Sequence, residues 1–308
     1  CSIYYESLIK SKFKIKCYTD PIYYLKAIKN AVEIQNMRSA HIKDGVALTK
    51  FLYWIKQEKN FGFDEFYLEK KLESLRKRSK DYIYPSFNTI AGSGPNSAII
   101  HYRSSKNTNR KIRKKDIFLC DSGGQYKYGT TDVTRTICFS KQPSSIKKIF
   151  TKVLKGHIAV VTSDLKTHYN GKLIDKRARK YLNESGLDFK HGTGHGVGFF
   201  SNVHEGPQAI SKLNTIKLQE GMILSNEPGY YRKGKFGIRI ENLIYIKKIN
   251  NNLSFVNLTL APIDNDLINY SLLNRQEKNY LFNYHLNIYV NLSKYLNKKE
   301  RKWLASFI

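Results

Sequence analysis

The sequence predicts an α+β fold in which blocks of helices and blocks of antiparallel hairpins follow one another. Apolar residues recur at three- and four-residue intervals over residues 22–80, as in helices that bury one face. Short apolar segments divided by Gly, Ser and Asn follow over residues 88–140, as in strands. Because the two patterns come in runs, with no internal repeat of about 20–50 residues, antiparallel sheets are favoured over a parallel doubly wound sheet.

Each predicted element rests on its local period. Helical spacing is found at residues 23–57, 63–79, 144–161, 172–182 and 274–306. Strand-like segments are found at residues 88–102, 116–128, 129–139, 221–231 and 236–249. The sequence therefore predicts a domain of helices and strands that ends in a helical tail.

The composition is that of a globular chain, with 308 residues of which 41% are hydrophobic and 13% aromatic. No apolar run reaches the roughly 18–20 residues that span a bilayer, and the first residues, CSIYYESLIK, lack a signal-peptide pattern. We therefore expect a cytoplasmic protein with no membrane partner. The cysteines show no CxxC spacing and are expected to be reduced thiols: Cys1, Cys17, Cys120 and Cys138.

The formal net charge of +28 raises the question of nucleic-acid binding. The lysines are scattered along the whole chain, and the densest cluster, NRKIRKK at 109–115, lies in a polar stretch before an apolar strand. We therefore expect no specific nucleic-acid partner.

Two carboxylates are expected to meet in a first hairpin. Asp121 and Asp132 enclose the segment SGGQYKYGTT, and a reversal about Tyr126 and Lys127 would make them cross-strand neighbours. Two carboxylates placed opposite one another repel unless positive charge lies between them. Taken singly, each aspartate could instead be a turn residue with a solvated side chain.

A second hairpin repeats this arrangement. Glu227 in LSNEPGYY and Glu241 in GIRIENLIY flank a predicted turn whose midpoint is Gly234. Both glutamates lie in or at the end of apolar runs, where an unpaired carboxylate costs several kcal/mol.

Three histidines stand in the segment HGTGHGVGFFSNVHEGP: His191, His195 and His204. A surface loop is one interpretation. A zinc site on a helix is another, but the glycines argue against a helix. A third is a metal centre completed by distant residues. Four carboxylates and one histidine would suit a pair of divalent cations, and Mn²⁺ is the natural choice for oxygen-rich ligands, with Zn²⁺ or Co²⁺ also considered.

The order Asp121, Asp132, His195, Glu227 and Glu241, in the contexts DSGGQY, TTDVTRT, GTGHGVG, NEPGYY and RIEN, resembles the pita-bread metallopeptidases of family M24. Within them the chain is most similar to the Xaa-Pro aminopeptidases of the longer, eukaryotic-type branch, over roughly residues 20–308. PSFNTIAGSGPNSAIIHY, HGTGHGVGFFSNVHEGP and LTLAPID add to the likeness. The resemblance implies the pita-bread fold, an antiparallel curved sheet flanked by helices, with a helical C-terminal extension.

The resemblance also implies an activity: hydrolysis of the N-terminal Xaa-Pro peptide bond by a hydroxide that bridges two metal ions. The expected substrates are peptides with proline in the second position. A prolidase or a methionine aminopeptidase on the same fold is the nearest alternative. An alternative of another class is a non-catalytic pita-bread module that binds peptides, histones or RNA. Such modules typically lose metal ligands, whereas all five positions are occupied by ligand-type residues here.

Roles are carried over to matching positions. Asp121 would bind one metal, Asp132 and Glu241 would bridge both, and His195 with Glu227 would complete the second. Catalytic roles fall to Glu227 as proton acceptor, to His204 as proton shuttle and to His101. On the substrate side, His101, His191 and His204 would contact substrate or the developing oxyanion, and Arg239 would orient a ligand carboxylate. His191 and His204 as solvated loop residues, and His101 as a core-edge residue, remain alternatives.

Other features receive structural or organisational interpretations. His41, His157 and His168 are given no functional role. Residues 1–21 are predicted to be a linker or the remnant of an upstream domain, 22–250 the catalytic domain, and 251–308 an extension that packs on the domain or at the interface of a homodimer. The segment YRSSKNTNR after His101 is more basic than is usual in the family. Without the family's upstream domains, activity could be weaker or less selective.

Overall fold

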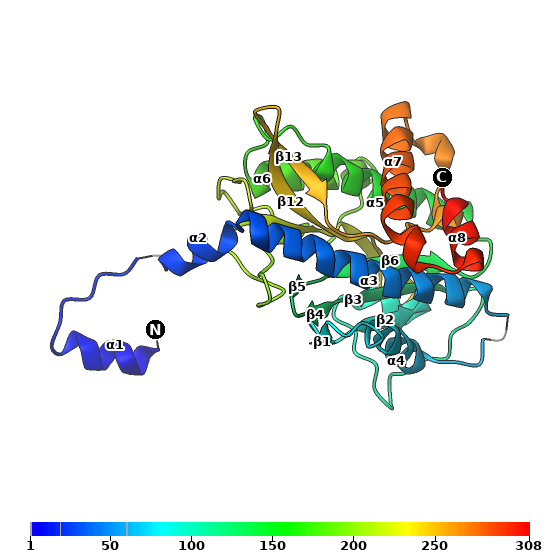
Figure 1. The fold of residues 1–308 in the computed structure, drawn as a ribbon, viewed down its shortest axis with the longest axis horizontal. Coiled ribbons are helices and arrows are strands. Elements are labelled where there is room, and N and C mark those ends of the chain that lie inside the picture. The colour runs from blue at the N-terminus through cyan, green and yellow to red at the C-terminus, as the bar shows by residue number, and fades with distance from the viewer. Residues whose placement is uncertain (1, 19, 60) are drawn as a thin grey trace.

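The computed structural model describes residues 2–18, 20–59 and 61–308, and it confirms a mixed architecture of helices and sheets (Figure 1). The helices are α1 (Ile3–Lys10), α2 (Pro21–Ala27), α3 (Ala31–Gln57), α4 (Glu65–Arg76), α5 (Ser144–Val161), α6 (Gly171–Asn183), α7 (Arg275–Leu292) and α8 (Lys298–Ala305). Short 3-10 helices are η1 (Gly94–Ala98), η2 (Asn265–Leu267), η3 (Tyr270–Leu272) and η4 (Ser293–Tyr295).

The strands are short and pair locally. They are β1 (Tyr82–Pro85), β2 (Ile90–Ser93), β3 (Ile117–Ser122), β4 (Gly124–Tyr126), β5 (Gly129–Thr130), β6 (Val133–Cys138), β7 (Gly194–His195), β8 (Ala209–Ile210), β9 (Ile223–Asn226), β10 (Gly229–Arg232), β11 (Phe236–Arg239), β12 (Asn242–Ile249) and β13 (Asn252–Asn257). They pair in the orders β1-β4-β5, β2-β3-β6, β13-β12-β9, β10-β11 and β7-β8. Each of these pairings is antiparallel, which confirms the predicted sheet type.

Helix α3 forms because its start is capped and one of its faces is apolar. Asn30 and Glu33 make a capping box that satisfies free amides of the first turn. Further along, Phe51 packs in a fully buried cluster with Leu68 of α4 and Phe118 of β3. The long helix, which runs across the body in Figure 1, is thereby fixed against the sheet that carries the first carboxylates.

The C-terminal helices share the core of the preceding residues. Leu281 and Ile288 of α7 are buried in one cluster with Phe150 of α5 and with Ile238 and Ile240 around the end of β11. Residues 251–308 therefore pack on the body. The predicted domain boundaries at residues 21 and 250 stay predictions.

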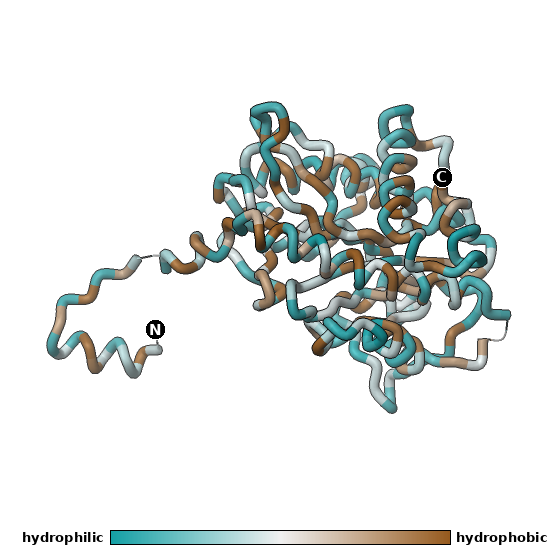
Figure 2. Tube along the Cα trace, viewed as in Figure 1, coloured by the Kyte–Doolittle hydropathy of each residue, from teal (hydrophilic) through white to brown (hydrophobic). Residues whose placement is uncertain are grey.

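The N-terminal arm differs from the rest of the chain. Helix α1 buries none of its residues and α2 buries only Ala27. In Figure 1 this arm extends away from the body, and Figure 2 shows apolar residues along it.

One predicted strand is largely wrong. Residues 88–102 contain only the short strand β2, because Gly94 adopts a left-handed φ of 53° and the chain then turns through η1. His101 consequently lies in a turn after η1 rather than in a strand.

Two expectations from the sequence concern the cysteines and membrane-spanning segments. Cys17, Cys120 and Cys138 are free thiols, as predicted, while Cys1 lies outside the described residues. Among residues 2–18, 20–59 and 61–308, the structure has no helix with the length and apolarity needed to cross a membrane.

Candidate active site

The first pair of carboxylates lies at one end of the β3–β6 hairpin. Asp121 is in β3 and faces Thr134 of β6, while Asp132 directly precedes β6. Both aspartates are buried, at 8% and 4% exposure. A solvated turn position, which was the alternative for each residue alone, does not describe either of them.

The hairpin reverses one residue later than the sequence predicts. Tyr126 still pairs with Gly129, so the reversal lies at 127–128. Tyr126 is fully buried, and this burial keeps it in the strand instead of the turn. The shift moves the pairing by two residues, so that Asp132 lies diagonally from Asp121 on the same face rather than directly opposite.

The second pair is placed by the β10–β11 hairpin. Gly229 pairs with Arg239, and the same register continued by two residues brings Glu227 opposite Glu241, as predicted. Gly234 adopts a φ of 69° in the connecting turn, a conformation that favours glycine. The amide of Glu241 donates to the carbonyl of Thr134 at 3.1 Å and so joins the two hairpins.

His195 reaches these carboxylates because its backbone lies very close to β9. A side chain at Gly194 would come within 1.9 Å of the carbonyl oxygen of Ser225, so glycine is required there. The amide of His195 donates to Ser225 Oγ at 2.9 Å, and Ser225 Oγ in turn donates to Glu227 Oε1 at 3.1 Å. One serine therefore aligns the imidazole and a carboxylate.

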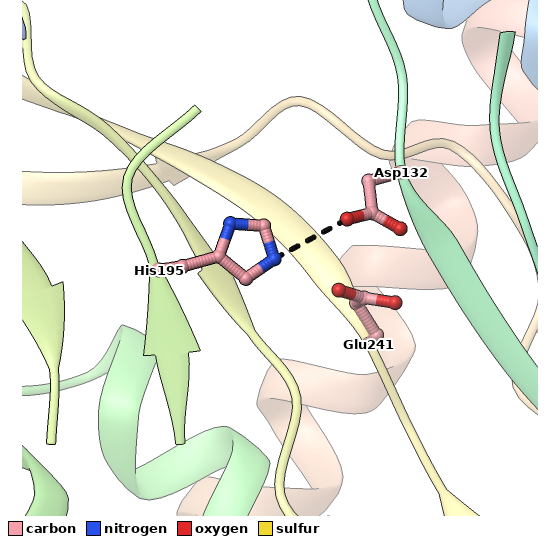
Figure 3. A group of neighbouring side chains, drawn as sticks. All are labelled: Asp132, His195 and Glu241. Carbon is pink, nitrogen blue, oxygen red and sulfur yellow. Dashed lines mark ion pairs between the residues drawn. The ribbon is translucent and has the colours of Figure 1, made fainter. Parts of the chain in front are cut away.

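The five predicted metal ligands converge on one cavity. His195 Nε2 lies 3.4 Å from Asp132 Oδ2 and 3.4 Å from Glu227 Oε1. Asp132, His195 and Glu241 each offer one ligand atom, and these atoms lie within 4.8 Å of one another (Figure 3). Asp121 lines the same cavity, which has a volume of about 550 Å³.

The charge of this cluster is poorly balanced by the protein itself. Burial raises the pKa of Asp132 and Glu241 well above the usual range, and the neighbouring carboxylates raise both further. Burial also raises the pKa of Glu227. Asp121 Oδ1 is buried and makes no hydrogen bond within the described residues. The protein does not fully compensate the negative charge of these carboxylates. A donor set of four carboxylates and one imidazole in this state fits two divalent cations.

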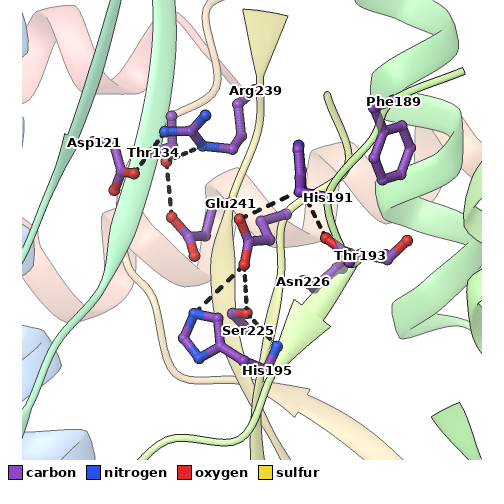
Figure 4. A network of polar contacts seen from close by, with 12 residues as sticks. Asp121, Thr134, Phe189, His191, Thr193, His195, Ser225, Asn226, Arg239 and Glu241 are labelled. Carbon is purple, nitrogen blue, oxygen red and sulfur yellow. Dashed lines mark hydrogen bonds and ion pairs between the residues drawn. The ribbon is translucent and has the colours of Figure 1, made fainter. Parts of the chain in front are cut away.

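Arg239, the last residue of β11, connects the two hairpins by hydrogen bonds to residues of β3 and β6 (Figure 4). Its Nη2 donates to Asp121 Oδ2 at 2.6 Å, and its Nε donates to Thr134 Oγ1 at 3.0 Å. The Thr134 hydroxyl donates onward to Glu241 Oε2 at 2.8 Å. The predicted orienting arginine thus holds Asp121 directly and reaches Glu241 through a threonine that sequence reasoning missed.

His191 is fixed by hydrogen bonds at both ring nitrogens. Its Nδ1 donates to the carbonyl of Gly192 at 2.7 Å, which leaves Nε2 to accept from the Tyr231 hydroxyl at 2.9 Å. The Tyr231 oxygen accepts from Arg239 Nη1 at 2.7 Å. Burial, followed by the charge of Arg239, lowers the pKa of His191 to about 4, so the ring is neutral at neutral pH.

His204 and His101 line the same cavity but are held differently. The ring of His204 packs on that of His195 with centroids 3.8 Å apart; the residue is exposed as a whole, but partial burial of its ring, followed by the charge of His195, lowers the pKa of His204 to about 4. Within the part of the chain that the structure describes, the His204 side chain makes no hydrogen bond. His101 is exposed at the cavity edge, so its alternative as a core-edge residue is wrong.

A buried network from α6 supports the histidine loop. Arg179 donates to Asp175 at 2.8 Å and to the carbonyl of His191 at 2.7 Å. Asp175 also accepts from the Thr193 hydroxyl at 2.7 Å, and the carbonyl of Thr193 accepts from the amide of Glu227 at 2.8 Å. The spacing of four residues between Asp175 and Arg179 is the one sequence signal that could have pointed to this network.

A second cluster of possible metal ligands, Cys138, Asp264 and Asp266, is explained by a lysine. Lys56 Nζ donates to both carboxylates at 2.8 Å and to the carbonyl of Cys138 at 2.8 Å. The cation that these groups require is therefore supplied by the chain.

The histidines without a predicted function have structural surroundings. His41 and His157 are buried and bond to the backbone carbonyls of Met37 and Asn226. His168 is half-buried.

Comparison with protein families places this site in a known context. Residues 35–248 match the model of metallopeptidase family M24, and residues 251–306 match that of the C-terminal region of peptidase M24. The chain is 45% identical over 299 residues to a Laccaria bicolor protein described as "Probable Xaa-Pro aminopeptidase P", covering 92% of this chain and 47% of that protein. The chain spans about half the length of the curated relatives it matches.

Solved structures of similar fold include proline-specific peptidases. An X-prolyl aminopeptidase from Caenorhabditis elegans, described as a cytosolic enzyme with a di-nuclear active site, is 38% identical with a TM-score of 0.87 and covers 94% of this chain and 49% of its own. A prolidase from Pyrococcus furiosus is 29% identical with a TM-score of 0.70 and covers 84% of this chain and 73% of its own. These likenesses confirm the fold that the resemblance implied.

Proposed function

Because the chain belongs to metallopeptidase family M24, we propose that it is a metal-dependent exopeptidase that hydrolyses the N-terminal Xaa-Pro peptide bond. The observation that carries this proposal is the convergence of four carboxylates and His195 on one cavity. The likeness to an X-prolyl aminopeptidase over 94% of the chain supports the proline specificity.

Asp121, Asp132, His195, Glu227 and Glu241 would hold two divalent ions. When bound, such ions polarise a carbonyl group and lower the pKa of water toward neutrality. We favour Mn²⁺ because four of the five side chains offer oxygen, while Zn²⁺ or Co²⁺ would also suit the set. The orphaned Asp121 Oδ1 supports binding of a cation at this aspartate.

The chain's own residues would manage the protons and the substrate. Glu227, at the cavity wall beside His195, would accept a proton during attack on the carbonyl before proline. His204 would carry a proton toward the leaving proline nitrogen. His191, held neutral with its ring fixed by Tyr231, would contact substrate, and His101 would do so from the cavity edge.

The cavity offers apolar surface for a proline ring. Its lining includes the apolar side chains of Phe87, Ile90, Ile100 and Val203. Proline has no backbone N–H and a fixed φ, so a site that selects it must recognise shape rather than an amide donor. Apolar side chains in the same cavity as the carboxylates would supply such recognition.

The alternatives are less well supported. A prolidase or methionine aminopeptidase would share the fold, and prolidase structures have TM-scores of 0.67–0.72, as does an X-Pro aminopeptidase from Thermotoga maritima at 0.70; the preference rests on the C. elegans X-prolyl aminopeptidase, with 0.87 at 38% identity. Prolidases act on dipeptides alone, so chain-length preference separates the two. For a non-catalytic binding module, the retention of all five ligand-type residues has no explanation.

Metal loading and peptide release test the proposal together. After chelation the chain should be inactive, and Mn²⁺ should restore release of arginine from a peptide that begins Arg-Pro-Pro, but not from one that begins Arg-Ala-Pro. Asp132→Asn removes one of the four carboxylate charges that would hold the metals. It should lower metal affinity and reduce kcat/KM by at least about 100-fold, since loss of the hydrogen-bonding partners of ligands already costs 10–100-fold. Full activity of Asp132→Asn without bound metal would contradict the two-metal proposal.

We also propose a cytosolic location and a homodimer. The location is supported by the C. elegans relative, which is described as cytosolic. The dimer is supported by the apolar side chains that α7 exposes: Phe282, Leu286 and Val290.

A further inference from the structure

The loop that presents His204 is anchored at residues other than His204 itself: Val197 is fully buried, and Gln125 Nε2 donates to the carbonyl of Ser201 at 2.6 Å. Residues 196–207 contain no helix or strand, and His204 is exposed. Because the structure shows no hydrogen bond to the His204 side chain in the described residues, the position of this ring depends on how the surrounding loop is held. The ring must nevertheless stay beside His195, 3.8 Å away.

The next residue, Glu205, anchors the loop. Its side chain is only 6% exposed, and its Oε2 accepts from Ser201 Oγ at 2.8 Å and from Lys26 Nζ at 2.7 Å. Its amide donates to the carbonyl of Gly196 at 2.8 Å. The amide of Glu205 therefore ties its end of the loop to the beginning at Gly196, and its carboxylate ties it to Ser201 and Lys26.

Lys26 comes from α2, which lies far away in sequence and is lightly attached to the body. Apart from Ala27, the residues of α2 are not buried. The hydrogen bonds that the structure shows from the Lys26 side chain, at 2.7 Å to Glu205 and 3.4 Å to Ser201, both end on the His204 loop. α2 is thus attached where it can affect this loop.

The surroundings of Glu205 make Lys26 important. Burying a carboxylate is costly unless a cation and hydrogen bonds compensate it, and removal of one partner leaves an uncompensated buried charge. Glu205 Oε1 is buried and makes no hydrogen bond within the described residues. Lys29 is a second cation near Glu205, but its buried Nζ makes no hydrogen bond within the described residues, so Lys26 is the cation that bonds to this carboxylate.

We infer that Lys26 is a positioning residue that, through Glu205, fixes the loop presenting His204 to the cavity. It would touch neither metal nor substrate. The catalytic consequence rests on the proposed function of His204, whereas the hold on the loop does not. Loss of Lys26 should therefore loosen residues 196–207 and lower turnover while leaving the metal ligands in place.

The test compares Lys26→Met with a matched ion pair elsewhere. Lys155 and Glu277 also meet at 2.7 Å, and they lie outside the cavity. Lys155 is 15% exposed against 46% for Lys26, while the two glutamates are equally buried, so Lys155→Met controls for loss of stability. In metal-free chains, hydrogen–deuterium exchange of residues 196–207 should rise in Lys26→Met and not in Lys155→Met. Unchanged exchange in Lys26→Met would overturn the inference whether or not the chain is a peptidase.

Kinetics of the metal-loaded chain add a second readout. Lys26→Met should lower kcat/KM about 10- to 100-fold, which is the effect of a misplaced group near the reacting atoms. Its metal content should be unchanged. Lys26→Arg should retain most of the kcat/KM of the parent. In a background of His204→Ala, adding Lys26→Met should change kcat/KM by less than about twofold. Losses that multiply would show that Lys26 does not act through His204. An inactive parent chain would contradict the proposed function alone.

Discussion

Thr134 joins the two carboxylate hairpins through a single hydroxyl group. The hydroxyl accepts from Arg239 Nε at 3.0 Å and donates to Glu241 Oε2 at 2.8 Å. Thr134→Val keeps the shape but removes both bonds. Groups that orient a ligand typically contribute 10–100-fold to metal affinity, so we expect Mn²⁺ affinity, measured by calorimetry, to fall by about that factor.

Thr151 offers a matched control for this substitution. It is buried, and its hydroxyl donates to the Lys147 carbonyl and accepts from the Asn269 amide, but it lies outside the cavity. Thr151→Val should lower stability without changing Mn²⁺ affinity. Equal effects of the two valine variants on affinity would mean that the Thr134 hydroxyl has no specific role at Glu241.

His204 is expected to transfer protons rather than bind metal. It lies at the cavity wall, packed on His195, and its ring makes no hydrogen bond in the described part of the chain. His204→Ala should lower kcat by about 10²–10⁴, the usual range for a lost acid or base, while metal content measured by mass spectrometry stays at the parent level. Joint loss of metal and activity would make His204 a ligand.

At the residue scale, the sequence identified site residues that stand in unusual surroundings, and it missed site residues whose types are common in the chain. Glu227 and Glu241 stood out because charged groups are costly inside apolar runs, and His195 because three histidines cluster in one glycine-rich segment. Thr134 and Tyr231 did not, because their types occur throughout the chain and only the folded geometry gives them a role. Their neighbours in TTDVTRT and NEPGYY offered the only hint.

At the scale of elements, hairpin register was predicted well where glycine fixed the turn and poorly where burial decided it. Gly234 centred the β10–β11 turn as expected. In the first hairpin, burial of Tyr126 moved the reversal by one residue. The segment 88–102 was misread because an apolar pattern cannot show that Gly94 turns the backbone.

Helix α7 carries a buried histidine that links stability to pH. His285 Nε2 accepts from the Ile263 amide at 3.1 Å, and burial lowers the pKa of His285 to about 3. An unfolded histidine titrates near about 6.5. Below that pH the unfolded chain gains a proton that the folded chain does not take up, so the contribution of His285 to stability is complete above pH ~6.5 and is lost as the pH falls toward ~3.

The unfolding free energy of the parent should fall as the pH is lowered. In His285→Gln the slope of this fall should be smaller by about 1.4 kcal/mol per pH unit between pH ~6 and ~4. Urea titrations at several pH values measure this slope. His168→Gln, at a histidine that is only half-buried, should keep the slope of the parent. The same slope in His285→Gln as in the parent would show that His285 is not held neutral in the folded chain.

At the scale of the whole molecule, the sequence predicted the fold class and the convergence of the ligands, because both depend on patterns that span the chain. It could not predict how the N-terminal arm sits. Apolar residues at helical spacing predicted buried helices from residue 22, yet Ile22 and Leu25 of α2 are 54% and 72% exposed. A period shows which residues share a face, not what covers it.

The helical tail supplies the last prediction, which concerns assembly. Phe282, Leu286 and Val290 follow one another at intervals of four on α7 and are 46%, 37% and 65% exposed, while Leu281 and Ile288 on the other side are buried. Contiguous exposed apolar side chains mark interaction surfaces, and a second copy of the chain is the proposed occupant. Leu286→Glu would place a charge in that interface.

We expect the parent chain to be a dimer at micromolar concentration by sedimentation velocity, and Leu286→Glu to be a folded monomer. The control is Leu213→Glu, which adds the same charge at a leucine that is 90% exposed and far from α7 in sequence; it should remain dimeric. Because the metal ligands come from residues 121–241 and α7 begins at Arg275, the Leu286→Glu monomer should still bind Mn²⁺. A monomeric parent chain, or a dimer that persists in Leu286→Glu, would show that α7 does not join two copies.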